Sequence, residues 1–158
     1  MKLSAQFFTN YGFYLKQRGS TRLGDRQGRW KRYFLVATGT GVTPYRAMQH
    51  ELMLLIDSGS EVNIVMGARD ESGLLYSDEF RDNAKKEGYQ YITCLSRVPY
   101  LDPSESDYQG HVQAYLEQIF FDPEEDIVFL CGNPAMVDES FRLLKEQGLP
   151  VPQIRREK

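Results

Sequence analysis

Residues 33–48 read YFLVATGTGVTPYRAM. The first five residues, 33–37, are apolar without a break and then meet turn residues, which predicts a buried strand. Two glycines separated by one threonine follow, and glycines at such a place are typical of a tight turn. Thr43 is placed to cap the next helix, and Pro44 suits a first helical turn. The stretch thus predicts a strand, a glycine turn and a helix in direct succession.

Short apolar runs alternate with amphipathic segments from there onward. We expect strands at 33–37, 62–67, 89–95, 127–131 and 153–158, and helices at 44–57, 77–87, 111–120 and 134–147. Residues 96–109 contain two prolines and three acids, and they predict a loop. This alternation indicates an α/β fold: a Rossmann-like, open, five-stranded parallel sheet with helices on both faces.

The composition excludes several classes of protein. Of the 158 residues, 41% are hydrophobic and 26% charged, as in one globular domain, and the net charge of −3 argues against general nucleic-acid binding. No apolar run approaches about 18 residues, so we expect no membrane span. The first ten residues lack a secretory h-region and the two cysteines cannot build a disulfide framework, which favours the cytoplasm. His50 and His111 lack partners at metal-ligand spacing, so no metal site is expected.

Charge is spread unevenly along the chain. Residues 1–32 hold eight lysines and arginines and one acid, whereas residues 33–158 hold eleven basic and twenty-one acidic residues. Residues 16–32 also lack an apolar period, so we interpret 1–32 as a basic connector ahead of a domain that starts at Tyr33. A solvated basic loop and a docking surface for an acidic partner both remain open for this segment.

Unusual residues follow three of the predicted strands. Parallel strands bring their carboxyl ends to one edge of a sheet, where ligands bind. Gly39 and Gly41 carry no Cβ, so a ligand can approach the backbone, and the N–H groups of the next helix favour a pyrophosphate. No Walker pattern is present, and Pro44 stands where the third glycine of G-x-G-x-x-G would be, so a plain turn also remains open.

The other two strand ends are Ser96-Arg97 and Cys131-Gly132-Asn133-Pro134. Arg97 has the fork geometry that binds a phosphate or carboxylate, although it also suits pairing with the acids of residues 102–107. Cys131 precedes a helix whose N-terminus can lower a thiol pKa, although a small buried hydrophobe is the alternative. Cys94 is expected in the core, apart from Cys131 and without a disulfide to it.

Four motifs in order resemble the ferredoxin–NADP reductase superfamily. They are residues 34–48, residues 67–69 with 74–80, Leu95-Ser96-Arg97 and residues 128–136. The resemblance implies an NAD(P)-binding domain over 33–158, with strand order 3-2-1-4-5. In such enzymes hydride passes between the nicotinamide and N5 of an FAD, and this domain orients the nucleotide.

The resemblance also implies the site. The expected cofactor-binding residues are Thr38, Gly39, Thr40, Gly41, Val42, Pro44, Arg69, Ser96, Arg97, Cys131, Gly132, Asn133 and Met136. The glycine loop would hold the pyrophosphate, and Ser96 and Arg97 the adenosine ribose with any 2′-phosphate. Cys131 is the expected catalytic residue, positioning the nicotinamide. The acids at 102, 105 and 107 oppose a phosphate, so at most a modest preference for NADP over NAD is expected.

Three departures from the family pattern limit the assignment. The flavin signature Arg-x-Tyr-Ser/Thr is absent, and residues 12–16 resemble only the last strand of a flavin domain, so 1–32 is interpreted as a remnant of that domain plus connector. The chain stops before the aromatic residue that often ends the family. Val137 stands where many plant-type members carry glutamate, with Asp138 one position late, which puts a carboxylate proton relay in doubt.

Together these features predict the NAD(P)H-binding domain of an FAD-dependent oxidoreductase, with FAD held by a domain or subunit outside this chain. We expect the isolated chain to be inactive. A non-catalytic nucleotide-binding or scaffold module that docks a separate flavoprotein is the alternative. The sequence does not indicate the electron carrier or the oligomeric state.

Replacement of Gly41 by valine (Gly41→Val) is expected to weaken nucleotide binding at least tenfold, or by about 1.4 kcal/mol. The added side chain would fill the space needed for close backbone approach, and the fold should survive if φ of Gly41 is negative. Calorimetric titration of the variant with NADPH checks this, and unchanged affinity would show that the loop is only a turn.

Overall fold

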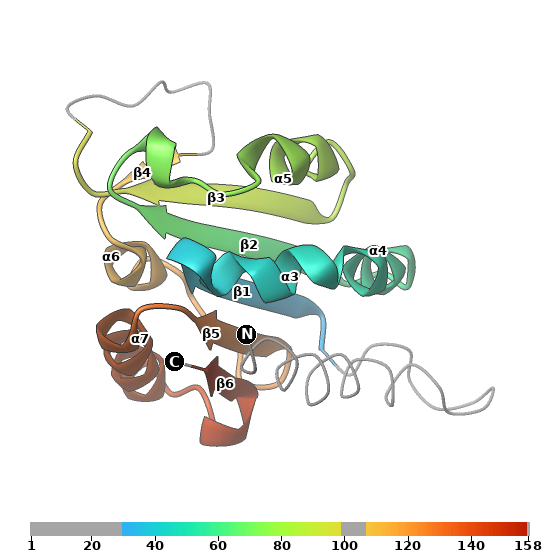
Figure 1. Ribbon diagram of the computed structural model, residues 1–158. Coiled ribbons are helices and arrows are strands. Elements are labelled where there is room, and N and C mark those ends of the chain that lie inside the picture. Colours follow the sequence, from blue (N-terminus) through green and yellow to red (C-terminus); the bar gives the residue numbers. More distant parts are fainter. Residues whose placement is uncertain (1–29, 99–106, 158) are drawn as a thin grey trace.

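Six parallel strands form the central layer of the computed structural model, which describes residues 30–98 and 107–157 (Figure 1). The strands are β1 (Arg32–Thr38), β2 (Glu61–Ala68), β3 (Tyr89–Leu95), β4 (Asp107–Gln109), β5 (Asp126–Cys131) and β6 (Ile154–Glu157). They lie in the order β4-β3-β2-β1-β5-β6, and every neighbouring pair is parallel. All carboxyl ends therefore meet at one edge of the sheet.

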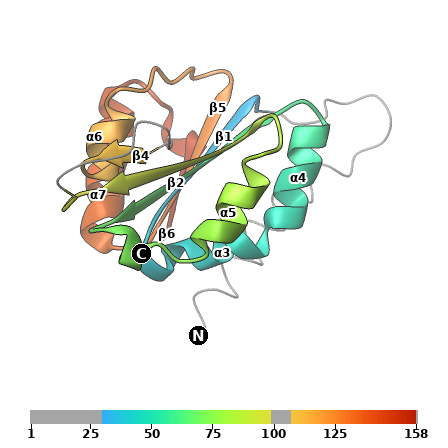
Figure 2. The same cartoon turned by 90° about the horizontal axis from the view of Figure 1, so that it is seen from above.

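Helices cover both faces of this sheet, as the view from above shows (Figure 2). On one face lie α3 (Thr43–Ala47), α4 (Gln49–Asp57) and α5 (Ser77–Asn83), and on the other α6 (Val112–Leu116) and α7 (Pro134–Glu146). Three short 3-10 turns complete the described chain: η2 (Gly39–Val42), η3 (Glu71–Gly73) and η4 (Val151–Gln153). Among the described residues, no helix is long and apolar enough to cross a membrane.

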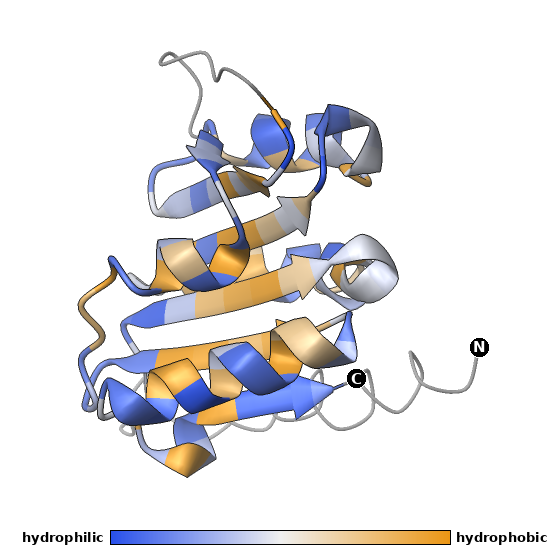
Figure 3. Cartoon of the chain, turned by 90° about the vertical axis from the view of Figure 1, so that its left-hand side faces the viewer, coloured by the Kyte–Doolittle hydropathy of each residue, from blue (hydrophilic) through white to orange (hydrophobic). Residues whose placement is uncertain are grey.

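The central strand β1 sends its side chains alternately into two hydrophobic clusters. Tyr33, Leu35 and Ala37 join the cluster beneath α3 and α4, whereas Phe34 and Val36 join the cluster beneath α6 and α7. All five are at most 4% exposed. A strand covered on both faces has no polar side, which is why the sequence shows a continuous apolar run here. Hydrophobic residues accordingly follow the central strands in Figure 3.

The sheet has six strands, so the predicted five-stranded sheet with order 3-2-1-4-5 is corrected. The added strand, β4, lies within residues 96–109, which were expected to be a loop, and it shifts the numbering of the two strands that follow. The three residues of β4 are polar and too few to form an apolar run. The strand is held instead by polar contacts: Thr93 donates a hydrogen bond to Asp107, and Gly110 N–H donates to the Leu95 carbonyl at 2.9 Å.

The helix expected at 44–57 is divided at Met48, whose φ of −93° and ψ of 11° end α3 before α4 begins. Pro44 does lie in the first turn, but Thr43 does not cap the helix, because it is already the first helical residue. The helix expected at 111–120 ends at Leu116. Phe120, the last residue of the predicted helix, is not packed against the sheet but is 90% exposed.

The folded part of the chain begins earlier than Tyr33. Arg32 is the first residue of β1, and Trp30 is buried in the cluster beneath α3 and α4. Pattern alone does not show this, because a single tryptophan among basic residues makes no apolar run. The expected remnant of a flavin domain at residues 1–29 lies outside the described residues.

An ion pair joins the amino ends of β1 and β5. The Asp126 side chain is fully buried, and it accepts hydrogen bonds from Arg32 Nε at 2.7 Å, from Arg32 Nη2 at 2.5 Å and from Asp122 N–H at 2.7 Å. Arg32 Nη2 also donates to the Phe120 carbonyl at 2.9 Å. A buried carboxylate satisfied by three donors fixes where the two central strands start.

We expect Arg32→Met to lower the free energy of unfolding by about 3 kcal/mol, the low end of the cost of removing one partner from a buried pair. The low end applies because the guanidinium is 30% exposed. Urea unfolding measures the change. Arg46→Met is the matched control, since Arg46 pairs with Glu79 and contacts the Tyr76 ring at an exposed site, and it should lower stability by at most about 1 kcal/mol. Equal effects of both variants would contradict the conclusion that the Arg32–Asp126 pair stabilises the fold more than an exposed pair does.

Candidate functional site

Two loops lie against each other at the carboxyl edge of the sheet, one after β1 and the other after β5. A Cβ on Gly41 would lie 2.4 Å from the carbonyl oxygen of Cys131, and a Cβ on Gly132 would lie 2.5 Å from the carbonyl oxygen of Thr38. Both distances are too short for any side chain. The two glycines therefore allow backbone to pass directly against backbone.

This contact gives Gly41 a structural role. Its missing Cβ makes room for the loop after β5, and its expected part in nucleotide binding stays a prediction. Gly41 does not have positive φ, yet a valine there would collide with the backbone of Cys131 and Gly132. The expectation that the fold tolerates Gly41→Val is therefore wrong.

Gly39 is the glycine that faces open space. Its φ is +56°, which favours glycine, and no atom lies within 4 Å of the position of a Cβ. Thr40 beside it is exposed as well. The backbone of Gly39 and Thr40 is therefore open to a ligand at this edge, as was expected for the whole glycine loop.

Two hydrogen bonds fix the loop after β5. Asn133 N–H donates to Thr38 Oγ1 at 3.0 Å, which joins the two loops, and Asn133 Oδ1 accepts from Ala135 N–H at 2.9 Å, which caps α7. The Asn133 side chain is exposed beside these contacts. Thr38, Gly132 and Asn133 thus come together with Gly39 and Thr40, as the sequence predicts.

Three of the expected binding residues lie beneath the loops and not on their surface. Val42 is fully buried, Met136 is 5% exposed, and Pro44 is buried in the first turn of α3. Next to them the Tyr45 hydroxyl lies 3.1 Å from the Val36 carbonyl and 3.0 Å from that of Phe129, and it donates to both strands. This part of the motif supports the loop from below.

The second part of the site lies where β2 and β3 end. Their ladder continues past the strands, because Ser96 N–H donates to the Ala68 carbonyl at 3.1 Å and Arg97 N–H donates to the Arg69 carbonyl at 2.8 Å. Both arginines are exposed and Ser96 is half-buried. The structure thus brings together Arg69, Ser96 and Arg97, which the resemblance assigned to one end of the nucleotide.

The acids expected to face Arg97 are arranged differently. Asp107 turns into the sheet edge, where it accepts a hydrogen bond from Thr93 and lies 3.4 Å from Arg81 Nη2, with its side chain 3% exposed. The residues at 102 and 105 lie outside the described residues. Instead, Asp70 follows Arg69 directly, and its pKa is lowered by hydrogen bonds from Ser72 and, more weakly, by the charges of Arg69 and Arg97.

Cys131 is a buried thiol and not an activated one. Burial and, more weakly, the charge of Glu157 raise its pKa to about 11, which favours the small buried hydrophobe of the two alternatives. Glu157 is opposite Cys131 in the β5–β6 register, and burial raises its own pKa. Val137 is fully buried, and the Asp138 carboxylate lies 3.4 Å from Arg156.

The two cysteines are free. Cys94 is fully buried on β3 and Cys131 lies on β5, and two strands separate them in the sheet, as expected. Burial raises the pKa of the Cys94 thiol as well.

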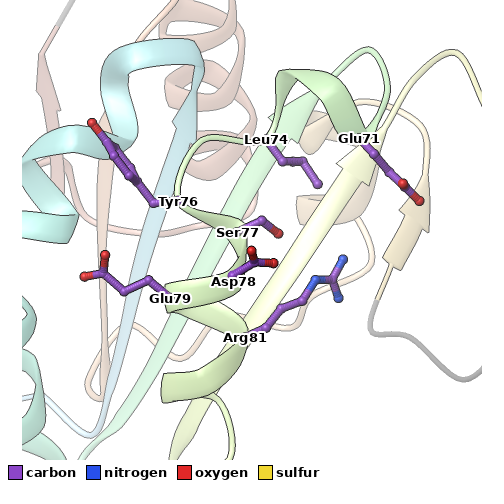
Figure 4. Close-up of a pocket in the computed structure, with 7 residues that line it drawn as sticks. All are labelled: Glu71, Leu74, Tyr76, Ser77, Asp78, Glu79 and Arg81. Atoms are coloured by element: carbon purple, nitrogen blue, oxygen red, sulfur yellow. The ribbon is translucent and has the colours of Figure 1, made fainter.

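A hollow of about 570 Å³ opens beside this edge, between η3 and the first turn of α5 (Figure 4). Its lining is mainly acidic, with Glu71, Asp78 and Glu79 against Arg81. Tyr76 also lines it and has φ of 58°, the only non-glycine positive φ in the described chain. The Arg46 guanidinium lies 4.4 Å from its ring centre. No sequence signal marks this conformation, because tyrosine rarely adopts it.

Comparison with known proteins identifies relatives over most of the chain. The family model of the oxidoreductase NAD-binding domain matches residues 35–140. A ferredoxin–NADP reductase B of Sorangium cellulosum is 36% identical over 124 residues, which cover 73% of this chain and 49% of that protein. The electron transfer component of toluate 1,2-dioxygenase from Pseudomonas putida is 26% identical over 118 residues, which cover 73% of this chain and 33% of that protein. The chain thus spans between a third and a half of these two relatives.

Solved structures show the same fold. The cytochrome P450 reductase GcoB of Amycolatopsis superimposes with a TM-score of 0.68 at 26% identity, over 85% of this chain and 38% of that one. A ferredoxin NADP+ reductase of Neisseria gonorrhoeae, solved with FAD and NADP bound, gives a TM-score of 0.62 at 21% identity. The match covers 81% of this chain and 56% of that one.

The two glycines of the first loop are expected to respond differently to alanine. Gly41→Ala should lower the free energy of unfolding by roughly 3 kcal/mol, the upper end for overpacking, because its Cβ meets backbone. Gly39→Ala should cost only about 1 kcal/mol of backbone strain, since its Cβ meets open space. Urea unfolding of both variants gives the comparison. A Gly41→Ala variant as stable as the wild type would show that the two loops are not in such close contact at Gly41.

Proposed function

This chain belongs to the family of oxidoreductase NAD-binding domains, and on that premise we propose that it binds NAD(P)H along the carboxyl edge of its sheet and presents the nicotinamide to a flavin held elsewhere. The observation that carries the proposal is the open backbone of Gly39 and Thr40, directly beside the exposed Asn133. A pyrophosphate is bound by backbone N–H groups at close approach, and a glycine without a side chain allows that approach.

The two parts of the edge suit the two halves of a dinucleotide. The two loops in contact after β1 and β5 offer backbone and the Asn133 amide, which suit a pyrophosphate and a nicotinamide. Arg69, Ser96 and Arg97 at the ends of β2 and β3 offer a hydroxyl and two guanidinium groups, which suit an adenosine ribose and its phosphates. Since β1 and β2 are neighbours, an extended ligand reaches from one part to the other along the edge.

The chemistry proposed for the whole protein is hydride exchange between the nicotinamide and an FAD, which supplies the electron acceptor. The contribution of this chain is orientation and exclusion of water. Cys131 suits that part: with a pKa near 11 its thiol remains protonated and uncharged at neutral pH, so it serves as a compact apolar contact and not as a nucleophile.

FAD enters the proposal only through another domain or subunit. A ferredoxin–NADP reductase of this fold was solved with both FAD and NADP, and this chain covers 56% of it. A cytoplasmic location is part of the proposal, since buried cysteines without a disulfide are typical of proteins in a reducing compartment.

Binding to the purified chain tests the proposal. Calorimetry should show one site for NADH or NADPH and no stoichiometric binding of FAD. In an amide correlation spectrum, added nucleotide should shift the signals of Gly39, Thr40 and Asn133. The signals of Ser60 and Glu125, at the opposite edge, serve as the internal control and should stay in place.

Two results would contradict it. Failure of both nucleotides to bind removes nucleotide binding altogether, and stoichiometric FAD binding places the flavin site within this chain. If added nucleotide shifted only the signals at the opposite edge, nucleotide binding would be confirmed but the proposed site would be wrong.

A further inference from the structure

We infer that Asp70 makes this site selective for NADH over NADPH. The inference rests on the proposed function, because it concerns how the adenosine half of the nucleotide is recognised at the ends of β2 and β3. It identifies an acidic residue that the sequence motifs do not include, and it gives the site a preference opposite to the one that Ser96 and Arg97 suggest.

Asp70 lies just beyond the end of β2, next to Arg69 of the proposed site. The β2–β3 ladder extends to the Arg97 N–H and the Arg69 carbonyl, which are 2.8 Å apart, so the backbones of the two arginines remain paired where the strands end. Asp70 is the next residue after Arg69 and is exposed. A carboxylate therefore stands at the place where the two cations of the predicted ribose site emerge.

Fixation is the second step. Asp70 Oδ1 accepts hydrogen bonds from Ser72 N–H at 3.0 Å and from Ser72 Oγ at 2.5 Å. These bonds lower the pKa of Asp70, and the charges of Arg69 and Arg97 lower it further. The carboxylate is thus held in one orientation and is ionised at neutral pH.

Charge balance is the third step. Asp70 and the exposed Glu71 offset the two arginines at this tip. Arg81, on the adjacent hollow, already lies 3.4 Å from Asp107. A 2′-phosphate carries a charge of about −1.5 to −2 and requires surplus positive charge. A ribose 2′-hydroxyl is neutral, and it can donate a hydrogen bond to a fixed carboxylate.

Titration of the full chain with NADH, NADPH, 5′-AMP and 2′,5′-ADP tests this. The wild type should bind NADH more tightly than NADPH, and 5′-AMP more tightly than 2′,5′-ADP. Asp70→Asn keeps a side-chain oxygen that can accept from Ser72 but removes the charge. It should tighten NADPH and 2′,5′-ADP about tenfold relative to NADH and 5′-AMP, an effect that shrinks as salt is added.

Asp57→Asn is the matched control, because it removes one exposed carboxylate from the end of α4, at the opposite edge of the sheet. It should leave the NADH-to-NADPH ratio unchanged. A wild type that prefers NADPH, or an Asp70→Asn ratio equal to that of Asp57→Asn, overturns the inference and leaves the proposed function standing. Failure of every nucleotide to bind the wild type overturns both.

Discussion

Direct contact between two backbone loops is the constraint on which this structure depends. β1 and β5 are neighbours in the sheet, but the chain leaves β1 toward α3 on one face and leaves β5 toward α7 on the other. Both departures take place at the same edge, where the two loops lie against each other. Gly41 and Gly132 permit this contact, because each would place a Cβ at most 2.5 Å from a carbonyl oxygen of the other loop. The candidate binding edge is therefore part of the fold, and the fold cannot change there without changing the edge.

That constraint determines which atoms remain for a ligand. Val42, Pro44 and Tyr45 are buried beneath the first loop, and the Tyr45 hydroxyl joins the loop to the carbonyls of both central strands. What stays on the surface is mainly backbone, at Gly39 and Thr40. A site made of backbone recognises the common parts of a nucleotide, the phosphates, and carries little information about which nucleotide is bound. Discrimination must therefore come from side chains elsewhere on the edge.

The sequence predicts what depends on burial and little of what depends on polar contacts. The strand at 89–95 and the helix that begins at Pro134 were expected with nearly their observed bounds, because each has an apolar pattern of the right period. The strand β4 was not expected, since Thr93 and Gly110 hold it through hydrogen bonds and no apolar run marks it. The glycine loop was recognised as a motif, but the packing that requires Gly41 was not predicted. The backbone that Gly41 contacts follows β5, which is far from it in the sequence.

The same limit explains why the position of Asp107 was misjudged. Sequence proximity suggested the carboxylates of residues 102–107, yet Asp107 turns back to Thr93 and is nearly fully buried. Asp70, remote in the chain, enters the electrostatic surroundings of Arg97 because the β2–β3 ladder continues one residue pair beyond the strands. In a parallel sheet the register between neighbouring strands decides which charges meet at the edge. An Asp-x-Ser sequence directly after a strand is the local signal that such a carboxylate will be held in place, since its side chain can accept from the backbone two residues on.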